Sequence, residues 1–386
     1  MRNALLLAAT LASAGALGAQ ASLRPPDAPA VAPTLEETRQ AMGIPSRGDL
    51  RGQQDAVGFA SRADQMAKVW EWAAQPPAPE SLGPRPSAGV AGAICPHDDY
   101  LYAARVYREV LPLVTARTVV LVGVFHKYRR YKVKDALVFD PYRAWRAPDG
   151  EIPVSPLREV LIGHLPKGDV IQDAADHDSE HSVEAIAYWL KHIRPDLQIV
   201  PILVPSASFP RFQELASRLG QALAGAMKAR GWTLGRDLAI VISSDGIHYG
   251  QDFHYAPYGD GGVTAFTRAM DRDRELLRGP LAGPVSAEKA RAFFEAAVNP
   301  ARPDEYRMPW CGRFSIPFGL LLMGETSRAL GLEPPVGMPV AFGASVDVPE
   351  LPVRPLGMGP TAPASLYHFV SYPAVAYVAG GKDMAR

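Results

Sequence analysis

The sequence has only two cysteines among its 386 residues, Cys95 and Cys311, so at most one disulfide can form within the chain. It has no excess of either charge, because 40 Lys and Arg residues balance 40 Asp and Glu residues. This balance gives no reason to expect a nucleic acid or a membrane surface as partner. No apolar stretch after the first 21 residues is long enough to span a membrane as a helix, and no internal repeat is present. With 47% hydrophobic residues, the chain can bury an ample core.

The first 21 residues predict a secretory signal. Arg2 supplies a positive start, residues 5–17 form a short apolar run, and the Ala-Gln-Ala at 19–21 fits a cleavage site before Ser22. The alternative is a cytosolic N-terminal helix. No cysteine follows the cleavage site, which argues against a lipoprotein anchor. We therefore expect an exported, periplasmic protein without membrane contact after signal cleavage.

The rest of the chain divides into two parts. Residues 22–86 are rich in proline and predict an N-terminal extension with one or two helices, and residues 87–386 predict the main domain. In the main domain, strand-like apolar runs alternate with helical patterns, which predicts a layered α/β fold. Pro201 indicates that the strand at 198–204 lies at a sheet edge or contains a bulge. The loop at 142–153 is expected to be solvated, with pocket formation as the alternative.

Three strand-like runs each lead into a histidine. The run at 89–94 precedes His97, the run at 118–124 precedes His126, and the run at 237–242 precedes His248. Ligands of open α/β sheets bind at the carboxyl edge of the strands, and uncharged imidazole is the commonest metal ligand in proteins. A single buried histidine is more often a structural residue, but three at equivalent positions indicate a site. His97 and His126 are therefore candidate metal ligands.

Cys311 is a candidate third ligand, because it lies on a glycine-containing turn before a predicted helix. A helix N-terminus lowers the pKa of a thiol and favours the thiolate. The alternative is a cysteine that is buried as a small apolar residue. Spacing in the sequence does not by itself bring Cys311 to the two histidines.

Two other polar clusters carry candidate residues. Asp245 lies three residues before His248, so its carboxylate can orient the imidazole or share a proton with it, or it can cap the next segment. His177 and His181 would share a face on one helix, but the Asp-Ser pair between them predicts a helix start there, which makes a zinc site from this pair weak. The remaining histidines have no partner pattern and are interpreted as structural or surface residues: His164, His192, His254 and His368.

These residues together resemble the Memo family, also called AmmeMemoRadiSam system protein B, from about Gly89 to Gly380. The similar motifs, in chain order, are Pro96-His97-x-x-Tyr100, Gly123-x-x-His126, Glu180-His181-Ser182-x-Glu184, Ser243-Ser244-Asp245-x-x-His248-x-Gly250, Cys311-Gly312-Arg313 and the final run from Val375 to Gly380. The chain departs from the family pattern at Asp98-Asp99, which replace a small pair, and at Phe125, Lys127 and Phe314.

The resemblance implies a fold like that of class III extradiol dioxygenases, with a central mixed, largely parallel sheet flanked by helices. It also implies roles for six residues. The implied metal ligands are His97, His126 and Cys311, the implied catalytic residues beside the metal are His248 and Asp245, and His181 is implied to be a further catalytic residue that lies close to the metal or faces the substrate.

The resemblance also brings Cys311 to His97 through the metal. Because Cys95 lies two residues before His97, it would then lie close to Cys311 in a compartment where disulfides form. We expect a reduced, metal-bound Cys311 in the active protein. A Cys95–Cys311 disulfide is one expectation after metal loss, and simple burial of Cys95 is the other.

The leading functional hypothesis is an exported metalloprotein with one iron or copper ion per chain. It would act as a redox enzyme or an oxygenase-like protein on an unknown small molecule. The alternatives are a non-enzymatic periplasmic protein that binds copper or iron, and a zinc-dependent hydrolase in which His248 or Asp245 is the base. No nucleic acid partner is expected.

Overall fold

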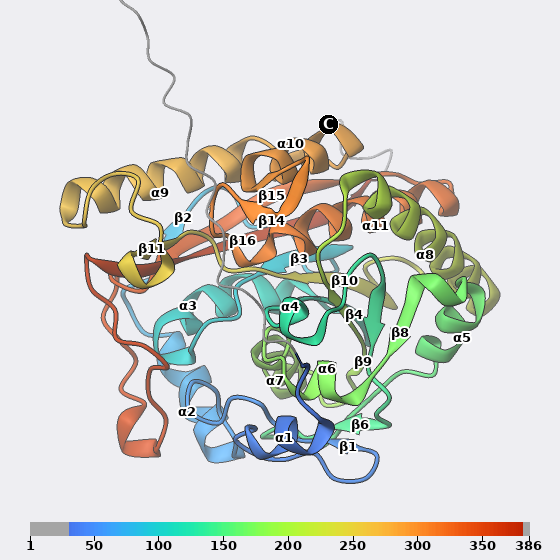
Figure 1. Cartoon of the computed structure of the whole chain (residues 1–386), viewed down its shortest axis with the longest axis horizontal. Coiled ribbons are helices and arrows are strands. Elements are labelled where there is room, and N and C mark those ends of the chain that lie inside the picture. Colours follow the sequence, from blue (N-terminus) through green and yellow to red (C-terminus); the bar gives the residue numbers. More distant parts are fainter. Residues whose placement is uncertain (1–30, 381–386) are drawn as a thin grey trace, which may run out of the picture.

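A large mixed sheet forms the centre of the molecule (Figure 1). The computed structural model describes residues 31–380, so the predicted signal at 1–21 lies outside the described residues. Across the main path of the sheet, the strands are β12 (Gly283–Pro284), β15 (Glu333–Ala344), β16 (His368–Gly380), β3 (Gly92–Cys95), β10 (Leu238–Ser243), β4 (Thr118–Val124), β9 (Gln198–Val204), β5 (Leu137–Phe139) and β8 (Val170–Gln172). Off this path, β11 (His248–Gly250) pairs with β16, and β2 (Glu80–Ser81) pairs with β15.

The middle of the sheet is parallel. β10 lies between β3 and β4 and is parallel to both, and β9 continues the parallel set beyond β4. On either side the pairing becomes antiparallel, at β16 next to β3 and at β5 next to β9. The predicted α/β fold with a mixed, partly parallel sheet flanked by helices is confirmed. Because parallel strands point the same way, the carboxyl ends of β3, β10 and β4 lie at one edge of the sheet.

Helices cover both faces of this sheet (Figure 1). The helices are α1 (Leu35–Gln40), α2 (Ala63–Ala73), α3 (Tyr100–Val110), α4 (Tyr128–Tyr131), α5 (Leu157–His164), α6 (Ala174–Asp178), α7 (Glu184–Ile193), α8 (Phe209–Arg230), α9 (Val263–Arg278), α10 (Ala287–Ala297) and α11 (Ser315–Leu330). Short 3-10 turns are η1 (Leu111–Leu113), η2 (Lys167–Asp169), η3 (Gln251–Phe253), η4 (Cys311–Arg313) and η5 (Arg354–Leu356). No helix within residues 31–380 has the length and apolar character needed to cross a membrane.

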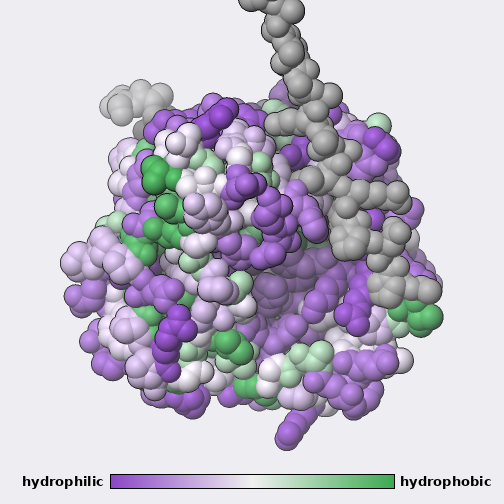
Figure 2. Space-filling model, turned by 60° about the vertical axis from the view of Figure 1, so that its left-hand side comes forward, coloured by the Kyte–Doolittle hydropathy of each residue, from purple (hydrophilic) through white to green (hydrophobic). Residues whose placement is uncertain are grey.

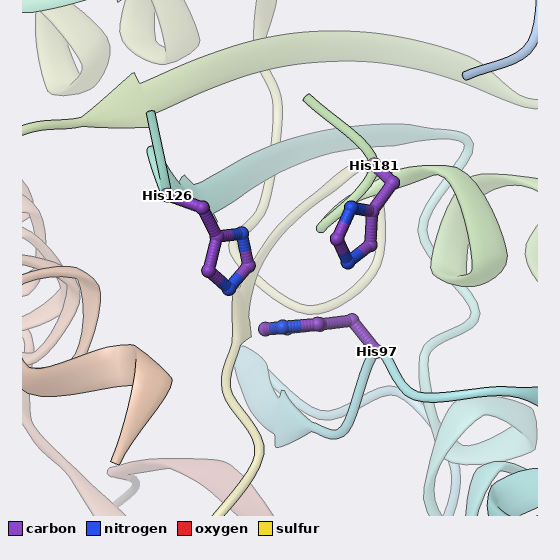
Figure 3. Close-up of side chains that lie close together, drawn as sticks. All are labelled: His97, His126 and His181. Atoms are coloured by element: carbon purple, nitrogen blue, oxygen red, sulfur yellow. The ribbon is translucent and has the colours of Figure 1, made fainter. Parts of the chain in front are cut away.

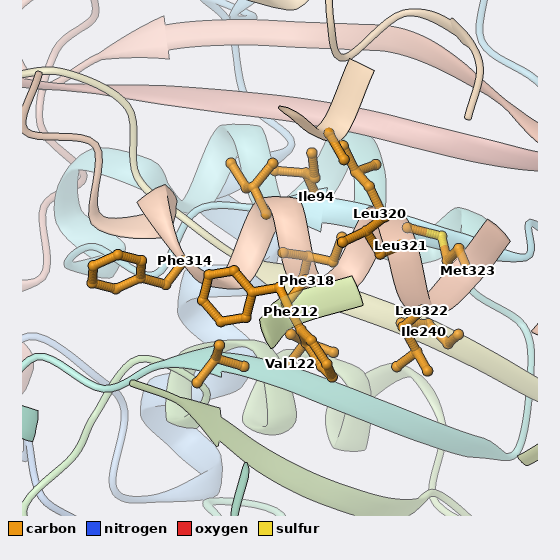
Figure 4. Packing of buried hydrophobic residues seen from close by; sticks show 14 of the residues in the cluster. Ile94, Val122, Phe212, Ile240, Phe314, Phe318, Leu320, Leu321, Leu322 and Met323 are labelled. Carbon is orange, nitrogen blue, oxygen red and sulfur yellow. The ribbon is translucent and has the colours of Figure 1, made fainter. Parts of the chain in front are cut away.

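The alternation of side chains along the strands builds two apolar cores. In β10, Ile240 and Ile242 pack into the core below α8 and α11, whereas Ala239 and Val241 pack into the core that contains α2, α3 and α7 residues. Figure 4 shows the first core, where Phe212 of α8 lies against Phe314 and Phe318. The second core includes Phe59 and α2, so the segment before the main domain packs into the same structure. The proposed boundary between residues 86 and 87 stays a prediction.

Gly319 has no side chain, and this lets α11 approach β10 closely. A Cβ atom at Gly319 would lie 2.4 Å from the Cδ1 atom of Ile242, a distance that side chains do not tolerate. α11 therefore sits directly on the strand that leads to Asp245 and His248. Because η4 immediately precedes α11, this contact also fixes the position of Cys311.

Two local predictions are wrong. Pro201 lies in β9, which is an interior strand between β4 and β5. β5 pairs with β9 only at Ile202 and Leu203, so Pro201 lies where that side of the strand has no β5 partner. The 142–153 segment is also not a solvated loop, because its Trp145 is fully buried and donates a hydrogen bond to Asp140 at 2.8 Å. It forms a small sheet of β1 (Leu50–Arg51), β6 (Ala144–Trp145) and β7 (Ile152–Pro153); a two-stranded ribbon of β13 (Val298–Asn299) and β14 (Arg302–Tyr306) lies elsewhere.

Candidate metal centre

Three imidazole rings meet at the carboxyl edge of the parallel strands (Figure 3). His97 follows β3, His126 follows β4, and His181 lies just before α7. The ring centroids of His97 and His126 are 5.1 Å apart, and those of His126 and His181 are 5.0 Å apart with nearly parallel planes. The expectation that strand ends bring His97 and His126 together is therefore confirmed, and His181 lies beside them.

The hydrogen bonds of His97 decide which of its ring nitrogens carries the proton. Its Nδ1 lies 2.7 Å from the Oγ atom of Ser243, and this hydroxyl donates its own proton to the Ser182 carbonyl. Nδ1 must therefore be the donor, and Nε2 keeps its lone pair. Burial, together with His126 and His181, lowers the pKa of His97 well below its ordinary value. A neutral imidazole with a free Nε2 is the form that binds metals.

Glu180 holds the Nδ1 atom of His126, as Ser243 holds that of His97. The Nδ1 atom of His126 lies 2.9 Å from Oε1 of Glu180, and its backbone N–H donates to Oε2 at 2.7 Å. Burial works against the charge of Glu180, but the pairing with His126 outweighs it and lowers the pKa of the carboxyl. Burial also lowers the pKa of His126, yet Glu180 and Cys311 raise it to about 10. A metal-binding histidine usually donates its other ring nitrogen to a carboxylate or a similar partner outside the ligand set. Here Glu180 takes Nδ1, which leaves Nε2 of His126 facing Cys311.

Replacing Glu180 with glutamine should weaken metal binding without removing a ligand. The amide keeps the shape of the side chain but loses the negative charge that holds Nδ1 of His126. Loss of such an outer partner typically lowers metal affinity about 10- to 100-fold. Titration against a chelator measures this change, with Glu159→Gln, a carboxylate on the exterior of α5, as the matched control. Unchanged affinity in Glu180→Gln would show that the carboxylate does not support the centre.

Cys311 lies next to His126. Its Sγ atom is 3.3 Å from Nε2 of His126 and 3.5 Å from Nε2 of His248. Gly312 fixes the turn, because its N–H donates to the Ser244 hydroxyl at 3.0 Å and a Cβ atom at this position would lie 2.2 Å from that oxygen. The expected fall in thiol pKa is wrong for the metal-free chain, since burial raises the pKa of Cys311 more than His126 lowers it. A bound cation would favour the thiolate.

Asp245 and His248 flank this group but do not pair with each other as expected. Asp245 accepts the backbone N–H of His97 at 2.8 Å, and its other oxygen lies 3.3 Å from Nε2 of the same ring. Burial and the nearby Asp98 raise the pKa of Asp245 to about 8. The Nδ1 atom of His248 lies 3.1 Å from the carbonyls of Gly246 and Pro309. These carbonyls, rather than Asp245, orient the His248 ring, and its Nε2 is left facing Cys311.

The ligand atoms form two overlapping groups that could hold a metal ion. One group is His97, His126 and His181, and the other is His97, Asp245 and Cys311; within each, the ligand atoms lie within 4.8 Å of one another. The predicted set of His97, His126 and Cys311 takes members from both groups and stays a prediction. Cys95 is a free thiol packed in the core with Tyr100 and Tyr107, an arrangement that favours simple burial.

Comparison with known proteins places the chain in a family. The model of the Memo-like protein family matches residues 59–327, which is more than half of the chain. The chain belongs to the Memo-like protein family. It is 28% identical over 177 residues to a MEMO1 family protein of Thermococcus onnurineus, covering 44% of this chain and 56% of that protein. With a MEMO1 family protein of Aquifex aeolicus it shares 26% identity over 216 residues, or 55% and 51% of the two chains. The chain thus spans about half the length of these relatives.

The centre of this Memo-like protein opens into a cavity of about 980 Å³. All six predicted site residues line it, and on the face shown in Figure 2 hydrophilic residues surround a hollow. Part of the wall comes from residues 41–57, which precede the segment that matches the family. Their loop is held by Glu184, which accepts the backbone N–H groups of Gln54 at 2.6 Å and Asp55 at 3.1 Å.

The structure also places residues in the cavity that sequence reasoning missed. His254 and His368 line it, although both were expected to be structural or surface residues. Asp55 lines it as well, and nothing in a proline-rich segment before the main domain pointed to that position. The predicted helix start between His177 and His181 is wrong, because α6 ends there and His177 turns into the core, where its Nε2 lies 3.1 Å from the Val138 carbonyl.

Proposed function

We propose that this Memo-like protein is an exported redox enzyme or oxygenase-like protein that acts on a small molecule, with iron or copper held by His97, His126 and Cys311. One observation carries the proposal. The Nδ1 atom of His97 is held by Ser243 and that of His126 by Glu180, so Nε2 of each ring is the atom left to bind a metal, and Nε2 of His126 lies 3.3 Å from the Cys311 sulfur. The export part rests only on the signal predicted at residues 1–21.

The donor set fits such an ion. Two imidazole nitrogens and one thiolate suit copper or iron, and zinc is a third suitable ion. When bound, the ion supplies electron transfer or polarises a substrate oxygen. The protein supplies the rest of the chemistry. His248 holds Nε2 at 3.5 Å from the Cys311 sulfur, where it can accept or return a proton, and His181 presents its ring to the cavity beside His126.

The metal content of protein purified without added metal tests this proposal. Iron or copper at one ion per chain, together with oxygen consumption in the presence of ascorbate, is the expected result. Tight copper without turnover would indicate a binding protein instead. Zinc together with ester or amide cleavage would indicate a hydrolase. Either of the last two results would replace the proposed redox function.

Replacing His248 with alanine should separate metal binding from turnover. The metal should remain, because His97, His126 and Cys311 are unchanged, whereas turnover should fall about 10²- to 10⁴-fold, the usual contribution of a general acid or base. Oxygen uptake and metal content are measured on the same samples. His164→Ala, which removes an exposed histidine of α5 outside the cavity, is the control and should keep its turnover. Metal loss in His248→Ala would make His248 a ligand and change the assignment.

A further inference from the structure

We propose that Asp273 is a positioning residue that holds Cys311 and His248 together at the candidate metal centre. The proposal rests on the function proposed above, because it concerns two residues of that site. Asp273 lies in α9, a helix that carries no predicted site residue and packs against β16 (Figure 1). Its side chain is fully buried and does not line the cavity. Asp273 therefore acts on the centre through its neighbours and not by contact with a ligand.

The carboxylate of Asp273 joins the two turns that carry Cys311 and His248. Its Oδ1 atom accepts the indole N–H of Trp310 at 2.7 Å, and Trp310 directly precedes Cys311. Its Oδ2 atom accepts the backbone N–H of Ile247 at 3.1 Å, and Ile247 directly precedes His248. One buried side chain thus fixes each turn at the residue before the site residue.

The same two turns meet a second time at the His248 ring. Its Nδ1 atom lies 3.1 Å from the carbonyl oxygens of Gly246 and Pro309, which are one residue further back in each turn. The ring's other nitrogen, Nε2, lies 3.5 Å from the Cys311 sulfur. Because Asp273 and the His248 ring bridge the turns at adjacent residues, a shift of one turn against the other would disturb both bridges and the distance between the sulfur and Nε2.

The turn before His248 is packed directly against the Asp273 carboxylate. A Cβ atom at Gly246 would lie 2.1 Å from the hydroxyl oxygen of Ser371 and 2.9 Å from Oδ2 of Asp273, so only glycine fits there. The Ser371 hydroxyl donates to Asp273 and accepts the N–H of Ile247 at 2.9 Å. The position of this turn therefore follows the position of Asp273.

The surroundings of Asp273 require a carboxylate. The three groups that contact it all donate hydrogen bonds, and all are neutral: the indole of Trp310, the backbone of Ile247 and the hydroxyl of Ser371. Burial raises the pKa of Asp273 to about 6, and the three donors work against this rise. A carboxylate offers only acceptors, whereas an amide of the same shape turns an N–H toward one of these donors. Asparagine at this position should therefore loosen the bridge without changing its volume.

The rate at which iodoacetamide modifies Cys311 tests this role in the full chain stripped of metal. Cys95, which is fully buried, reports any general opening of the core. The variants are Asp273→Asn and Trp310→Phe, which removes the same hydrogen bond from its other end, and their double variant. Asp140→Asn is the matched control, because Asp140 is also fully buried and accepts the indole N–H of Trp145 at 2.8 Å, but does not line the cavity or contact either turn.

A second measurement follows the metal-bound form. Each protein is titrated with Co²⁺, and the charge-transfer absorption of a cobalt–thiolate bond is recorded together with the unfolding midpoint in urea. This absorption depends on where the Cys311 sulfur lies relative to the other ligands, so a loss of stability alone does not change it. It should weaken in Asp273→Asn and stay unchanged in Asp140→Asn.

In Asp273→Asn and in Trp310→Phe, Cys311 should react about 10- to 100-fold faster than in the wild-type protein, the effect expected when a hydrogen bond to a charged group is lost. Cys95 should stay unmodified, and the double variant should react no faster than the single ones. An unchanged Cys311 rate, an equal increase in Asp140→Asn, or modification of Cys95 at the same rate as Cys311 would overturn the positioning role. A wild-type protein without cobalt–thiolate absorption would contradict the ligand set of the proposed function alone, because the alkylation rates remain readable.

Discussion

Alanine in place of His97, His126 or Cys311 is expected to give a folded protein that has lost its metal. The three side chains come from different strand and turn ends, and each end is held by its own backbone contacts. Removal of one of three ligands should lower the metal affinity by more than the roughly 100-fold loss that follows removal of an outer partner. Each variant is purified alongside the wild-type protein, and metal per chain and circular dichroism are measured together.

Two further variants sharpen this test. His164→Ala removes an exposed histidine of α5 whose Nδ1 contacts only the Val160 carbonyl, and it should keep full occupancy. His181→Ala separates the two overlapping donor groups, because His181 belongs to the group without the thiol. Metal loss in His181→Ala but not in Cys311→Ala would point to three histidines and refute the thiolate assignment.

Replacing Arg51 with methionine is expected to destabilise the protein by about 3–5 kcal/mol, the usual cost of breaking a buried ion pair. Both partners are fully buried, and the guanidinium lies 2.5 Å from Oε1 of Glu184. Arg51 also donates to the carbonyls of His177 at 2.7 Å and Glu180 at 2.6 Å. Burial raises the pKa of Glu184 to about 7 even with Arg51 beside it. Without the cation, this carboxylate has no positive partner.

Urea denaturation measures the change. Arg143→Met is the matched control, since Arg143 forms ion pairs with Asp49 and Glu151 on the surface of the same small sheet; its unfolding midpoint should stay unchanged. Because Glu184 holds the loop at 54–55, Arg51→Met should also loosen the wall of the cavity. A stability equal to that of the wild-type protein would show that Glu184 is satisfied by backbone N–H groups alone.

Much of the centre could be predicted from local patterns. The apolar runs before His97, His126 and His248 are short and uninterrupted, and parallel strands carry their carboxyl ends to the same edge. This geometry places the histidines without any knowledge of distant contacts. The turn at Cys311 could also be predicted, because a glycine follows it and a helix is expected after that. The structure adds that this glycine lies close against Ser244.

The predictions that were wrong concern contacts between segments that are distant in the sequence. The partner of Asp245 is His97, 148 residues away, whereas the sequence suggested either its neighbour His248 or a cap on the next segment. The thiol pKa of Cys311 is governed by burial, which helix position does not reveal. The wall at residues 41–57 is held by Glu184, far along the chain. No pattern within the N-terminal segment predicts that contact.

The same rule explains the misplaced segment at 142–153. Its polar appearance and its prolines predicted a solvated loop, yet Trp145 lies beneath the guanidinium of Arg51 at 4.1 Å. The partner that buries Trp145 comes from residues 50–51, which form β1 beside β6. A loop becomes part of a core when a strand from a distant segment covers it. The composition of the loop alone does not predict such a strand.

X-ray absorption at the edge of the bound metal tests the central claim most directly. The spectrum of the wild-type protein should contain one sulfur neighbour, near about 2.3 Å as in zinc–thiolate bonds, together with the scattering pattern of imidazole. In Cys311→Ser the sulfur neighbour should disappear, and in Cys95→Ser it should remain. A wild-type spectrum with only nitrogen and oxygen neighbours would contradict a centre built from His97, His126 and Cys311.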